Sequence, residues 1–579
     1  MEDTEQELTK FLANKKTPNK VRLATALPIL KQIKLMKKQF LYTGLAVMLT
    51  FSAVAQDKNA IKYSQTINKD RGYDHLSILA SDEYEGRETG TKGAWMAADY
   101  IKKQFKSFGL TGPVKGGKDP YFQNVGFSTK KLDKTTLTVN GQAKENLKDF
   151  YIMPNAVGDA GFDVKANAVI FAGFGISKDG FDEYAGQDVA GKVVMVFSSG
   201  DPTAKPAEAP AQGGRRAPSS VGSLQNKIKY LTEKKAAGVL VINPGVDNLN
   251  PQMKAYLSGG SEGLKYDKKK NATPTVAPIP VVTIGTAVAN QILSGANTTV
   301  DAAKKAITES VKPATVVINT PVTFAASIKE TVLRAENVLG FLEGSDPKLK
   351  NEVLVVTGHY DHIGLVKDPN AVDKVNNGAD DDGSGTTGVL LLAEAFAKAK
   401  KAGHGPKRSI LFMTVCGEEK GLLGSEWYSE YPVFPIANTI ANLNIDMIGR
   451  GDDARPGDNN FVYIIGSNML SDDLDNVSKK ANADYVNIVM DEKYNNRTDP
   501  NRFYYRSDHY NFAKFGIPVI FYFNGTHKDY HQPGDEVSKI DFPMLAKRSQ
   551  LVYFTAWELA NGANRPVVNK NEDGTPKTK

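Results

Sequence analysis

The sequence predicts an α/β fold built on a mixed, mainly parallel twisted sheet with helices on both faces. Three observations predict it. Short, continuous apolar runs recur through the last half of the chain, as buried parallel strands require. A stretch with helical periodicity separates two of these runs, which is the alternation expected of βαβ units. Side chains capable of chemistry follow the runs, at the strand ends where open α/β sheets bind ligands.

The predicted strands of this sheet follow one another from residue 337 onward. Residues 352–357 (EVLVVT) and 409–415 (SILFMTV) are apolar runs, and residues 384–400 between them have helical periodicity. Three more runs complete the set: residues 337–342 (NVLGFL), 441–445 (ANLNI) and 518–523 (PVIFYF). Upstream, residues 93–108 carry alanine, isoleucine and phenylalanine at helical spacing, which predicts an amphipathic helix packed on the sheet.

A second group of short β runs predicts a β-rich domain inserted at residues 150–321. Residues 225–236 read as an amphipathic helix, and residues 201–222 are rich in Pro, Ala, Gly and Ser. The latter stretch predicts a mobile loop, with substrate gating and simple solvation both open as its role. Residues 56–149 and 322–579 then make up the surrounding domain. The predicted strands of the insertion are residues 168–173, 192–197, 237–243 and 279–284.

The amino terminus has the pattern of a secretory signal peptide, residues 36–55. Met36-Lys37-Lys38 is a charged n-region, residues 39–52 lean apolar, and Ala53-Val54-Ala55 is a cleavage site. Residues 1–35 are therefore interpreted as a non-native upstream extension. The apolar stretch is short for a membrane span, so the prediction is an exported chain, periplasmic or secreted, without a stable membrane anchor. The alternative is a true polar extension before an internal anchor.

Length and composition limit the classes of protein that are possible. At 579 residues, the chain is expected to form at least two domains, and its one cysteine, Cys416, excludes an internal disulfide. The 72 basic and 65 acidic residues give a net charge of +7, but residues 1–55 hold nine Lys/Arg and four Asp/Glu. The remaining 63 basic and 61 acidic side chains carry only +2, which gives no argument for a nucleic-acid partner. Oligomeric state is left open.

Five side chains that can bind metal occur in the last half of the chain. Two are histidines and three are carboxylates, a mixed set that suits Zn²⁺ better than Ca²⁺ or Mg²⁺. One catalytic zinc usually takes three protein ligands, whereas five with one bridging carboxylate serve two ions about 3.5–4 Å apart. The pattern predicts a metallohydrolase. The five residues are His359, Asp381, Glu419, Asp446 and His531.

The motifs around these residues resemble those of the zinc-dependent exopeptidases of metallopeptidase family 28. Five stretches match in family order: GHYDHIG, NGADDDGSG, CGEEKGLLGSE, NIDMIG and DYHQPGDE. Residues 82–93 (DEYEGRETGTKG) resemble the family's amino-terminal segment, and the insertion resembles a protease-associated domain through GKVVMV and KKAAGVLVIN. Taken singly, DDDGSG is typical of an acidic turn and EE of a solvated face. All five in order make coincidence a minor explanation.

The resemblance implies the zinc exopeptidase fold and a ligand role for each metal-binding residue. His359 and Asp446 would be the terminal ligands of one Zn²⁺ ion. His531 and Glu419 would be those of the other. Asp381 would bridge the two ions.

The resemblance also implies three residues for the reaction itself. Glu418 would be the general base, and Asp361 would hold the imidazole of the ligand two residues before it. Tyr530 would help to polarise the substrate carbonyl. The peptide bond from Asp381 to Asp382 would be cis.

The implied activity is that of an exported aminopeptidase with two Zn²⁺ ions and a peptide substrate. A carboxypeptidase or dipeptidase on the same fold is an alternative, which would need a cationic pocket from Arg502 or Arg506. A single-zinc glutaminyl cyclase is another alternative. A binding module built on a dead peptidase would require the loss of ligands that are all present. Side-chain preference at the cleaved terminus stays open.

Four polar residues near the motifs match no ligand position. His362 and His509 are expected to lie behind the ligands or to pack in the core. For Asp508 and Asp535 two roles are left open: they could anchor the ligands, or they could form salt bridges or helix caps.

Overall fold

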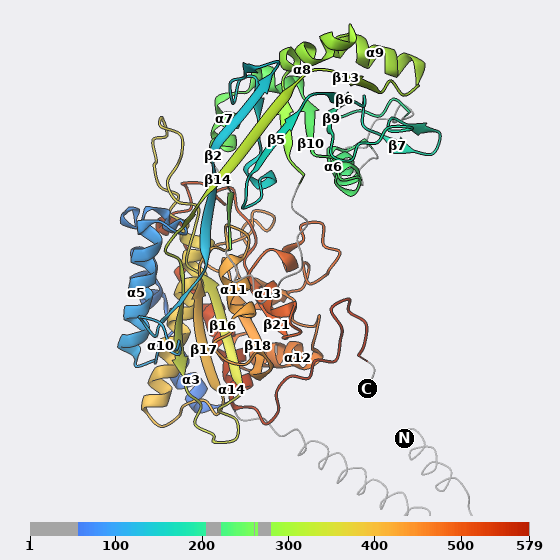
Figure 1. Ribbon diagram of the computed structural model, residues 1–579. Helices are drawn as coiled ribbons and strands as arrows, with labels where there is room; N and C mark the ends of the chain where they lie inside the picture. The colour runs from blue at the N-terminus through green and yellow to red at the C-terminus, as the bar shows by residue number, and fades with distance from the viewer. Residues whose placement is uncertain (1–55, 204–221, 260, 265–278, 578–579) are drawn as a thin grey trace, which may run out of the picture. The chain divides into compact units, whose positions relative to one another are not determined.

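The computed structural model describes residues 56–203, 222–259, 261–264 and 279–577 (Figure 1). Two units divide the chain, Met1–Lys62 and Tyr63–Lys579, and all the sheets belong to the second. The predicted extension and signal peptide at residues 1–55 lie outside the described residues, as do residues 204–221 of the predicted loop. Among the described helices, none combines the length and apolar character needed to cross a membrane.

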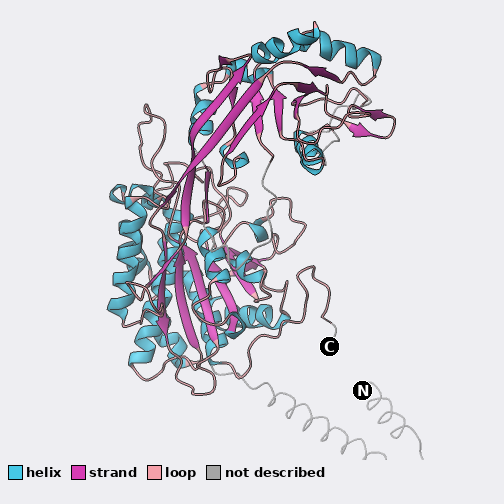
Figure 2. Cartoon of the chain, in the orientation of Figure 1, coloured by secondary structure: helices cyan, strands magenta, loops and turns pink. Residues whose placement is uncertain are grey.

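An eight-stranded sheet of order β1-β15-β17-β16-β18-β21-β19-β20 forms the central layer of the carboxyl-terminal half (Figure 2). Four neighbouring pairs are parallel and three are antiparallel. This confirms the predicted α/β fold with a mixed, mainly parallel sheet. The strands are β1 (Phe122–Asn124), β15 (Glu336–Leu342), β16 (Val353–His359), β17 (Ser409–Val415), β18 (Thr439–Ile445), β19 (Phe461–Ile465), β20 (Val489–Asp491) and β21 (Val519–Phe523).

The central strands have the continuous apolar character that burial on both faces requires. Every residue of β16, β17, β18 and β21 is buried. The predicted runs fall on these strands, with differences of up to two residues at the ends. His359 is the last residue of β16, whereas the sequence predicts that the strand ends at Thr357.

Helices cover both faces of the sheet (Figures 1 and 2). On one face, α10 packs on β16 and β17 and against α4, α5 and α14, while α12 packs on α14. On the other face, α13 packs on β18 and β21 and against α11. The helices are α4 (Lys69–Leu79), α5 (Lys92–Phe108), α10 (Gly385–Lys401), α11 (Leu423–Glu430), α12 (Asp472–Ala481), α13 (His509–Ala513) and α14 (Phe542–Asn561).

Helix α5 illustrates how local sequence produces these elements. It ends at Gly109, whose φ of 90° is in the left-handed region that glycine adopts most readily. The Gly109 N–H donates a hydrogen bond to the carbonyl of Lys106, which would otherwise be unpaired at the helix end. The apolar stripe buried against the sheet is the predicted one: Ala94, Ala97, Ala98, Ile101 and Phe105.

Between β1 and β15 the chain forms three further sheets, of which the smallest is the antiparallel pair β7 (Ser177–Lys178) and β8 (Phe181–Asp182). Of the two larger ones, the first has the order β11-β2-β14-β5, with β3 paired to β2, and the second has the order β13-β6-β9-β10-β12-β4. The four predicted runs of the insertion contain β6, β9, β10 and β12, which pair in parallel, and the predicted helix contains most of α6. The elements are β2 (Phe127–Val139), β3 (Gln142–Ala143), β4 (Phe150–Tyr151), β5 (Phe162–Ala166), β6 (Val169–Phe171), β9 (Val193–Phe197), α6 (Leu224–Glu233), β10 (Gly238–Ile242), β11 (Ser261–Leu264), β12 (Val281–Ile284), α8 (Thr286–Leu293), α9 (Val300–Ser310), β13 (Val316–Ile318) and β14 (Val322–Val332).

Candidate metal centre

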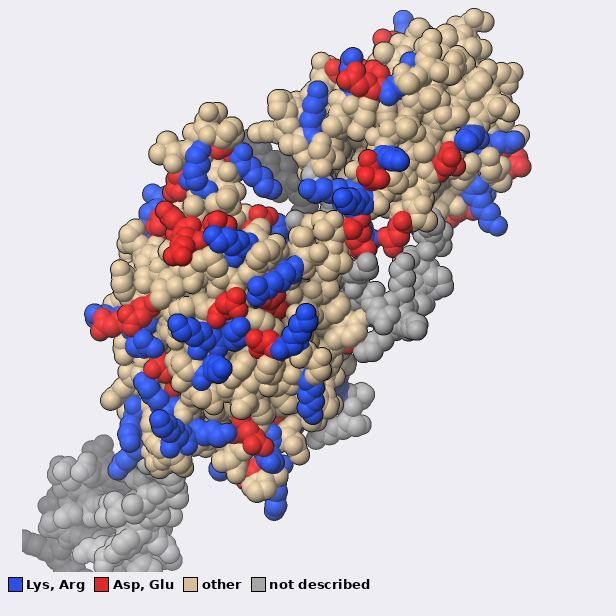
Figure 3. Space-filling view, turned by 60° about the vertical axis from the view of Figure 1, so that its left-hand side comes forward, with Lys and Arg blue, Asp and Glu red and all other residues tan. Residues whose placement is uncertain are grey.

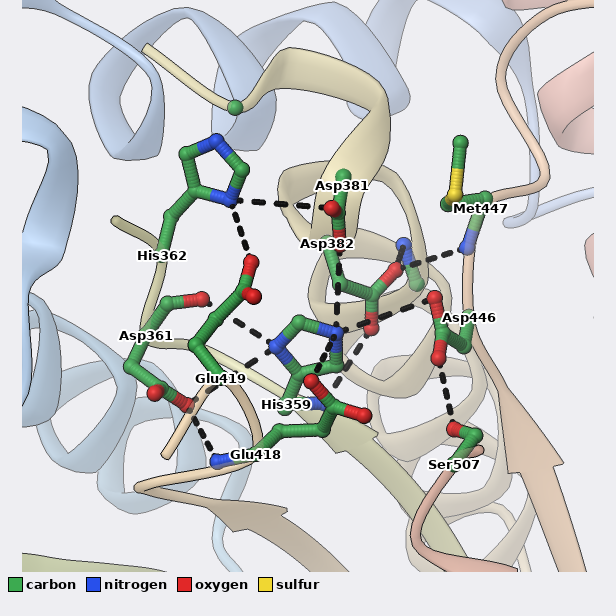
Figure 4. A network of polar contacts seen from close by, with 12 residues as sticks. His359, Asp361, His362, Asp381, Asp382, Glu418, Glu419, Asp446, Met447 and Ser507 are labelled. Atoms are coloured by element: carbon green, nitrogen blue, oxygen red, sulfur yellow. Dashed lines mark hydrogen bonds and ion pairs between the residues drawn. The ribbon is translucent and has the colours of Figure 1, made fainter. Parts of the chain in front are cut away.

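The parallel strands bring the predicted metal-binding side chains to one edge of the large sheet. Neighbouring parallel strands end at the same edge, so residues far apart in the sequence meet there (Figure 4). Asp381 reaches this edge from Ala379–Ser384, an irregular helical segment directly before α10. His359 ends β16, Glu418 and Glu419 follow β17, Asp446 follows β18, and His531 lies in the loop beyond β21.

The first cluster centres on His359, which is buried. Its Nε2 lies 3.3 Å from Asp381 Oδ1 and 3.7 Å from Asp446 Oδ1. The Oε2 atom of Glu418 is 3.9 Å from the same nitrogen. One imidazole nitrogen and carboxylate oxygens from different segments thus face a common point.

The second cluster centres on His531. Its Nε2 lies 3.1 Å from Asp381 Oδ2 and 3.1 Å from Glu419 Oε2. Asp381 therefore presents Oδ1 to one histidine and Oδ2 to the other, as a bridging carboxylate must. The structure brings all five predicted residues together in the two predicted groups, and their roles as ligands stay a prediction.

His362 also lies at the second cluster, although the sequence motifs predict no ligand at its position. The prediction puts this residue behind the ligands, whereas its Nδ1 lies 2.8 Å from Glu419 Oε1 and 3.8 Å from Asp381 Oδ2. The sequence feature that could have indicated a position near the metal is its place in the loop directly after β16, three residues beyond His359. His509 is buried and its ring stacks on Phe521, in agreement with the packing role expected for it.

The donor atoms of the second cluster fit a metal ion. Among the described residues, neither His531 Nε2 nor Asp381 Oδ2 has a hydrogen-bond partner, although they are 3.1 Å apart. The nitrogen and the oxygen are close, yet they are not aligned with each other. Buried polar atoms without partners are costly, and a cation bound between them would satisfy both. Nitrogen and carboxylate oxygen donors are those that zinc takes in proteins.

The electrostatics of the cluster also favour a cation. Burial lowers the pKa of His359, but the charges of Glu418 and Asp446 outweigh it and raise that pKa well above its ordinary value. Burial likewise opposes the charged form of His531, and its two carboxylate neighbours raise its pKa to about 10. The buried carboxylates thus hold protons on both imidazoles when no other positive charge is near.

Glu418 has the environment of a general base. Its side chain is largely buried beside His359, and burial raises its pKa well above the ordinary value, with Glu419 and Asp446 adding to the effect. A carboxylate with a raised pKa is a better proton acceptor. The backbone N–H of Glu418 donates to Asp361 Oδ1 at 3.2 Å, which holds the residue at the strand end.

Asp361 contacts the imidazole of His359 differently from the expectation. His359 Nδ1 lies 3.1 Å from the backbone carbonyl oxygen of Asp361 and 3.7 Å from its carboxylate. The carboxylate is engaged elsewhere, because it accepts hydrogen bonds from the Thr89 hydroxyl at 2.8 Å and from the Glu418 N–H. The carbonyl orients the imidazole, while the carboxylate ties the Glu418 segment to the amino-terminal segment.

Two further carboxylates hold the backbone around Asp381. Asp535 accepts hydrogen bonds from the N–H groups of Asp380 and Asp381 at 3.0–3.1 Å, so it anchors the segment rather than capping a helix. Asp382 accepts from the N–H groups of His359 and Met447, at the ends of two strands. The peptide bond between Asp381 and Asp382 is cis, which confirms the prediction. Asp508 is buried too, and burial raises its pKa to about 7.

Arg87 joins the amino-terminal segment to the loops of the centre. Its guanidinium is fully buried and donates hydrogen bonds of 2.6–2.8 Å to four backbone carbonyl oxygens, those of Leu79, Tyr360, Asn377 and Gly378. Two of these carbonyls directly precede the segment of Asp381, and a third follows His359. The sequence motif resembled the family, but it did not reveal this role.

We expect Arg87→Met to destabilise the protein by at least about 3 kcal/mol, since each buried carbonyl left unpaired costs about 1–3 kcal/mol. Thermal and urea unfolding of the metal-free protein would measure the loss. The matched control is Lys106→Met on the exposed side of α5, which should change stability by about 0.5 kcal/mol or less. Equal stability of the two variants would contradict the proposed anchoring.

A pocket opens beside the first cluster. Arg506 donates a hydrogen bond of 3.3 Å from Nη2 to the Tyr530 hydroxyl. Burial, followed by the charges of nearby carboxylates, raises the pKa of Tyr530 above its ordinary value, so its hydroxyl stays protonated. Arg502 instead lies over the ring of Tyr505 at 5.0 Å. The pocket is lined by Asp381, Glu418, Asp446, Met447, Phe503, Arg506, Phe521, Phe523, Thr526 and Tyr530.

Part of the chain is similar to a known protein family. Residues 337–556 match the profile of Peptidase family M28. A "Probable zinc metalloprotease" of Pyrenophora teres f. teres (strain 0-1) is 28% identical over 295 residues, which are 45% of this chain and 59% of the relative. A "Probable leucine aminopeptidase" of Arthroderma benhamiae (strain ATCC MYA-4681 / CBS 112371) is 27% identical over 219 residues, or 37% of this chain and 56% of the relative. The chain thus spans little more than half the length of these relatives.

Among solved structures, an aminopeptidase from Aneurinibacillus sp. strain AM-1 is similar to this chain. The match covers 90% of this chain and 100% of that one, with 18% sequence identity and a TM-score of 0.47.

Proposed function

Because residues 337–556 match the profile of Peptidase family M28, we propose that this chain is a zinc metallopeptidase, an aminopeptidase that uses two Zn²⁺ ions. The zinc and the cleavage of peptides accord with the relative named as a zinc metalloprotease. The preference for an amino terminus accords with the relative named as a leucine aminopeptidase.

The observation that carries this proposal is the position of Asp381 between the two histidine clusters. Its Oδ1 faces His359 at 3.3 Å and its Oδ2 faces His531 at 3.1 Å. One carboxylate shared in this way would serve two ions and not one. Terminal ligands would be His359 with Asp446 at one ion, and His531 with Glu419 at the other.

When bound, the zinc ions would supply Lewis acidity, which lowers the pKa of water and polarises a carbonyl. Glu418 would take a proton from the attacking water and return it to the leaving amine. Its burial beside His359 and its raised pKa suit both transfers. Tyr530, kept protonated at the pocket wall, would donate a hydrogen bond to the carbonyl oxygen of the substrate.

The proposal is tested by assaying matched peptides with free and with blocked amino termini. An aminopeptidase releases the first residue of the free peptide and leaves the blocked peptide intact. Metal analysis of the purified protein should find two zinc ions per chain. Turnover of blocked peptides alone would contradict the aminopeptidase assignment.

A carboxypeptidase or dipeptidase is the second candidate, and one observation favours it. Arg506 lines the pocket beside the Tyr530 hydroxyl and could pair there with a substrate carboxylate, whereas Arg502 is not among the residues that line it. Release of the carboxyl-terminal residue, abolished by Arg506→Met, would support this candidate over the first. A glutaminyl cyclase would instead form pyroglutamate with one tightly bound zinc per chain.

The inserted residues and the amino terminus also have proposed roles. Residues 150–321 would be a protease-associated domain inserted into the peptidase domain, which would comprise residues 56–149 and 322–579. Residues 36–55 would direct export to the periplasm or the medium. Peptides would be the substrates of this chain, without a nucleic-acid partner or a stable membrane anchor.

A further inference from the structure

His362 is held in place by groups that the proposed reaction does not use. The residue follows β16, its side chain is fully buried, and its backbone N–H donates to the carbonyl of Arg87 at 3.2 Å. Its ring lies against Gly378, where an added Cβ would be 2.5 Å from His362 Cγ. Gly378 has a φ of 57°, so both its conformation and the space around it favour glycine.

The ring points at the second cluster. His362 Nδ1 is 2.8 Å from Glu419 Oε1 and 3.8 Å from Asp381 Oδ2, and Figure 4 shows the imidazole aimed at both carboxylates. These three residues each offer a donor atom within 4.8 Å of the others. The two oxygens of Glu419 are thus divided, with Oε1 toward His362 and Oε2 toward His531.

The short contact between His362 and Glu419 is not a hydrogen bond. Among the described residues, both His362 nitrogens and Glu419 Oε1 lack a hydrogen-bond partner, despite the separation of 2.8 Å. The same holds for His531 Nε2, which lies 3.1 Å from two carboxylate oxygens. These atoms lie within ion-pair distance but without hydrogen bonds between them, and a shared cation would satisfy His362 Nδ1, Glu419 Oε1 and His531 Nε2 together.

We infer that His362 is a ligand of the metal ion held by Glu419 and His531, a sixth protein ligand beyond the five that the family resemblance implies. This inference rests on the proposed function, because it assumes that the centre binds two zinc ions. The ion would then have two imidazoles and two carboxylates, counting the shared Asp381. The other ion would have only three protein ligands, which leaves a position open for water or substrate.

The difference in ligand number predicts unequal sites. The site with four protein ligands should fill first and hold its ion more tightly, since a tetrahedral set is complete without solvent. The site of His359 and Asp446 should lose its ion first to a chelator.

The test is a chelator-competition titration of metal-free full-length protein with Zn²⁺, on wild type and variants. His362→Ala should weaken one of the two sites by at least about 100-fold, since even an outer hydrogen-bond partner of a ligand contributes about 10–100-fold in affinity. His362→Asn keeps an N–H donor near the position of Nδ1, so it should be as defective as the alanine variant if the imidazole binds metal. Zinc X-ray absorption should detect three imidazoles shared by two ions in wild type and two in either variant.

His75→Ala is the control for loss of a buried histidine. The side chain of His75 is 1% exposed and contacts Tyr100 and Arg71, so both zinc affinities should remain as in wild type. If wild type binds two zinc ions and His362→Ala binds both with unchanged affinity, the inference about His362 is wrong and the proposed function still stands. Full rescue by His362→Asn would overturn the inference too, because it would make His362 a positioning residue for Glu419. Wild type that binds no zinc would instead overturn the proposed function.

Discussion

Glu418→Gln is expected to keep both zinc ions and to lose about 10²–10⁴-fold in kcat, the range that a general base contributes. The amide has the shape of the carboxylate but cannot accept a proton at neutral pH. Glu418 lies outside the group of His359, Asp381 and Asp446, whose donor atoms are within 4.8 Å of one another, so we expect its charge not to be needed to hold either ion. Zinc content by metal analysis and kcat on a free-amine peptide would check the two parts separately.

The adjacent residue is the matched control. Glu419 Oε2 lies 3.1 Å from His531 Nε2, inside the second cluster, so Glu419→Gln should weaken zinc binding as well as turnover. The same substitution would then lower only kcat at Glu418, whereas at Glu419 it would also lower the affinity for zinc. Turnover of Glu418→Gln within a few-fold of wild type would remove Glu418 from the role of base.

Asp381→Ala is expected to lose both zinc ions and all measurable turnover. Its two oxygens face the two histidines separately, so removal of this one side chain leaves each ion a ligand short. Metal analysis after dialysis should find neither ion, and the peptide assay should give no product. A variant that retains full zinc occupancy would mean that another carboxylate bridges the ions.

The fold should survive this substitution, which keeps the result interpretable. The backbone of Asp381 is held by its N–H hydrogen bond to Asp535, and the adjacent Asp382 carboxylate is bonded to His359 and Met447. Unfolding of the metal-free variant should therefore resemble that of metal-free wild type. Asp373→Ala, at an exposed aspartate in the preceding loop, is the control and should keep both ions.

The strands and the five candidate ligands could be predicted because their signals are local. A buried parallel strand must be apolar along its whole length, so runs such as SILFMTV mark strands without knowledge of the fold. A polar residue directly after such a run lies at the carboxyl edge of the sheet. His359, Asp446 and the Glu418–Glu419 pair are all of this kind, and His531 lies in a loop beyond another strand.

Other features depend on contacts between distant segments, and only the tertiary structure decided them. The partners of Arg87 include carbonyls 290 residues away, and the hydroxyl of Thr89 reaches a carboxylate 272 residues away. Strand order, which places β16 between β17 and β18, is equally a long-range property. No local pattern encodes which carbonyl a buried guanidinium will meet.

The position of His362 depends partly on local sequence and partly on contacts between distant segments. The sequence by itself determined that a histidine follows β16 and that five other candidate donors occur in the last half of the chain. It did not determine the direction of the His362 ring, which depends on the space left by Gly378 and on the position of Glu419. Those groups come from separate segments, and their relative positions are set by the packing of the whole sheet and its helices. A metal ligand is defined by the convergence of atoms in space, so the last members of such a set emerge only from the folded chain.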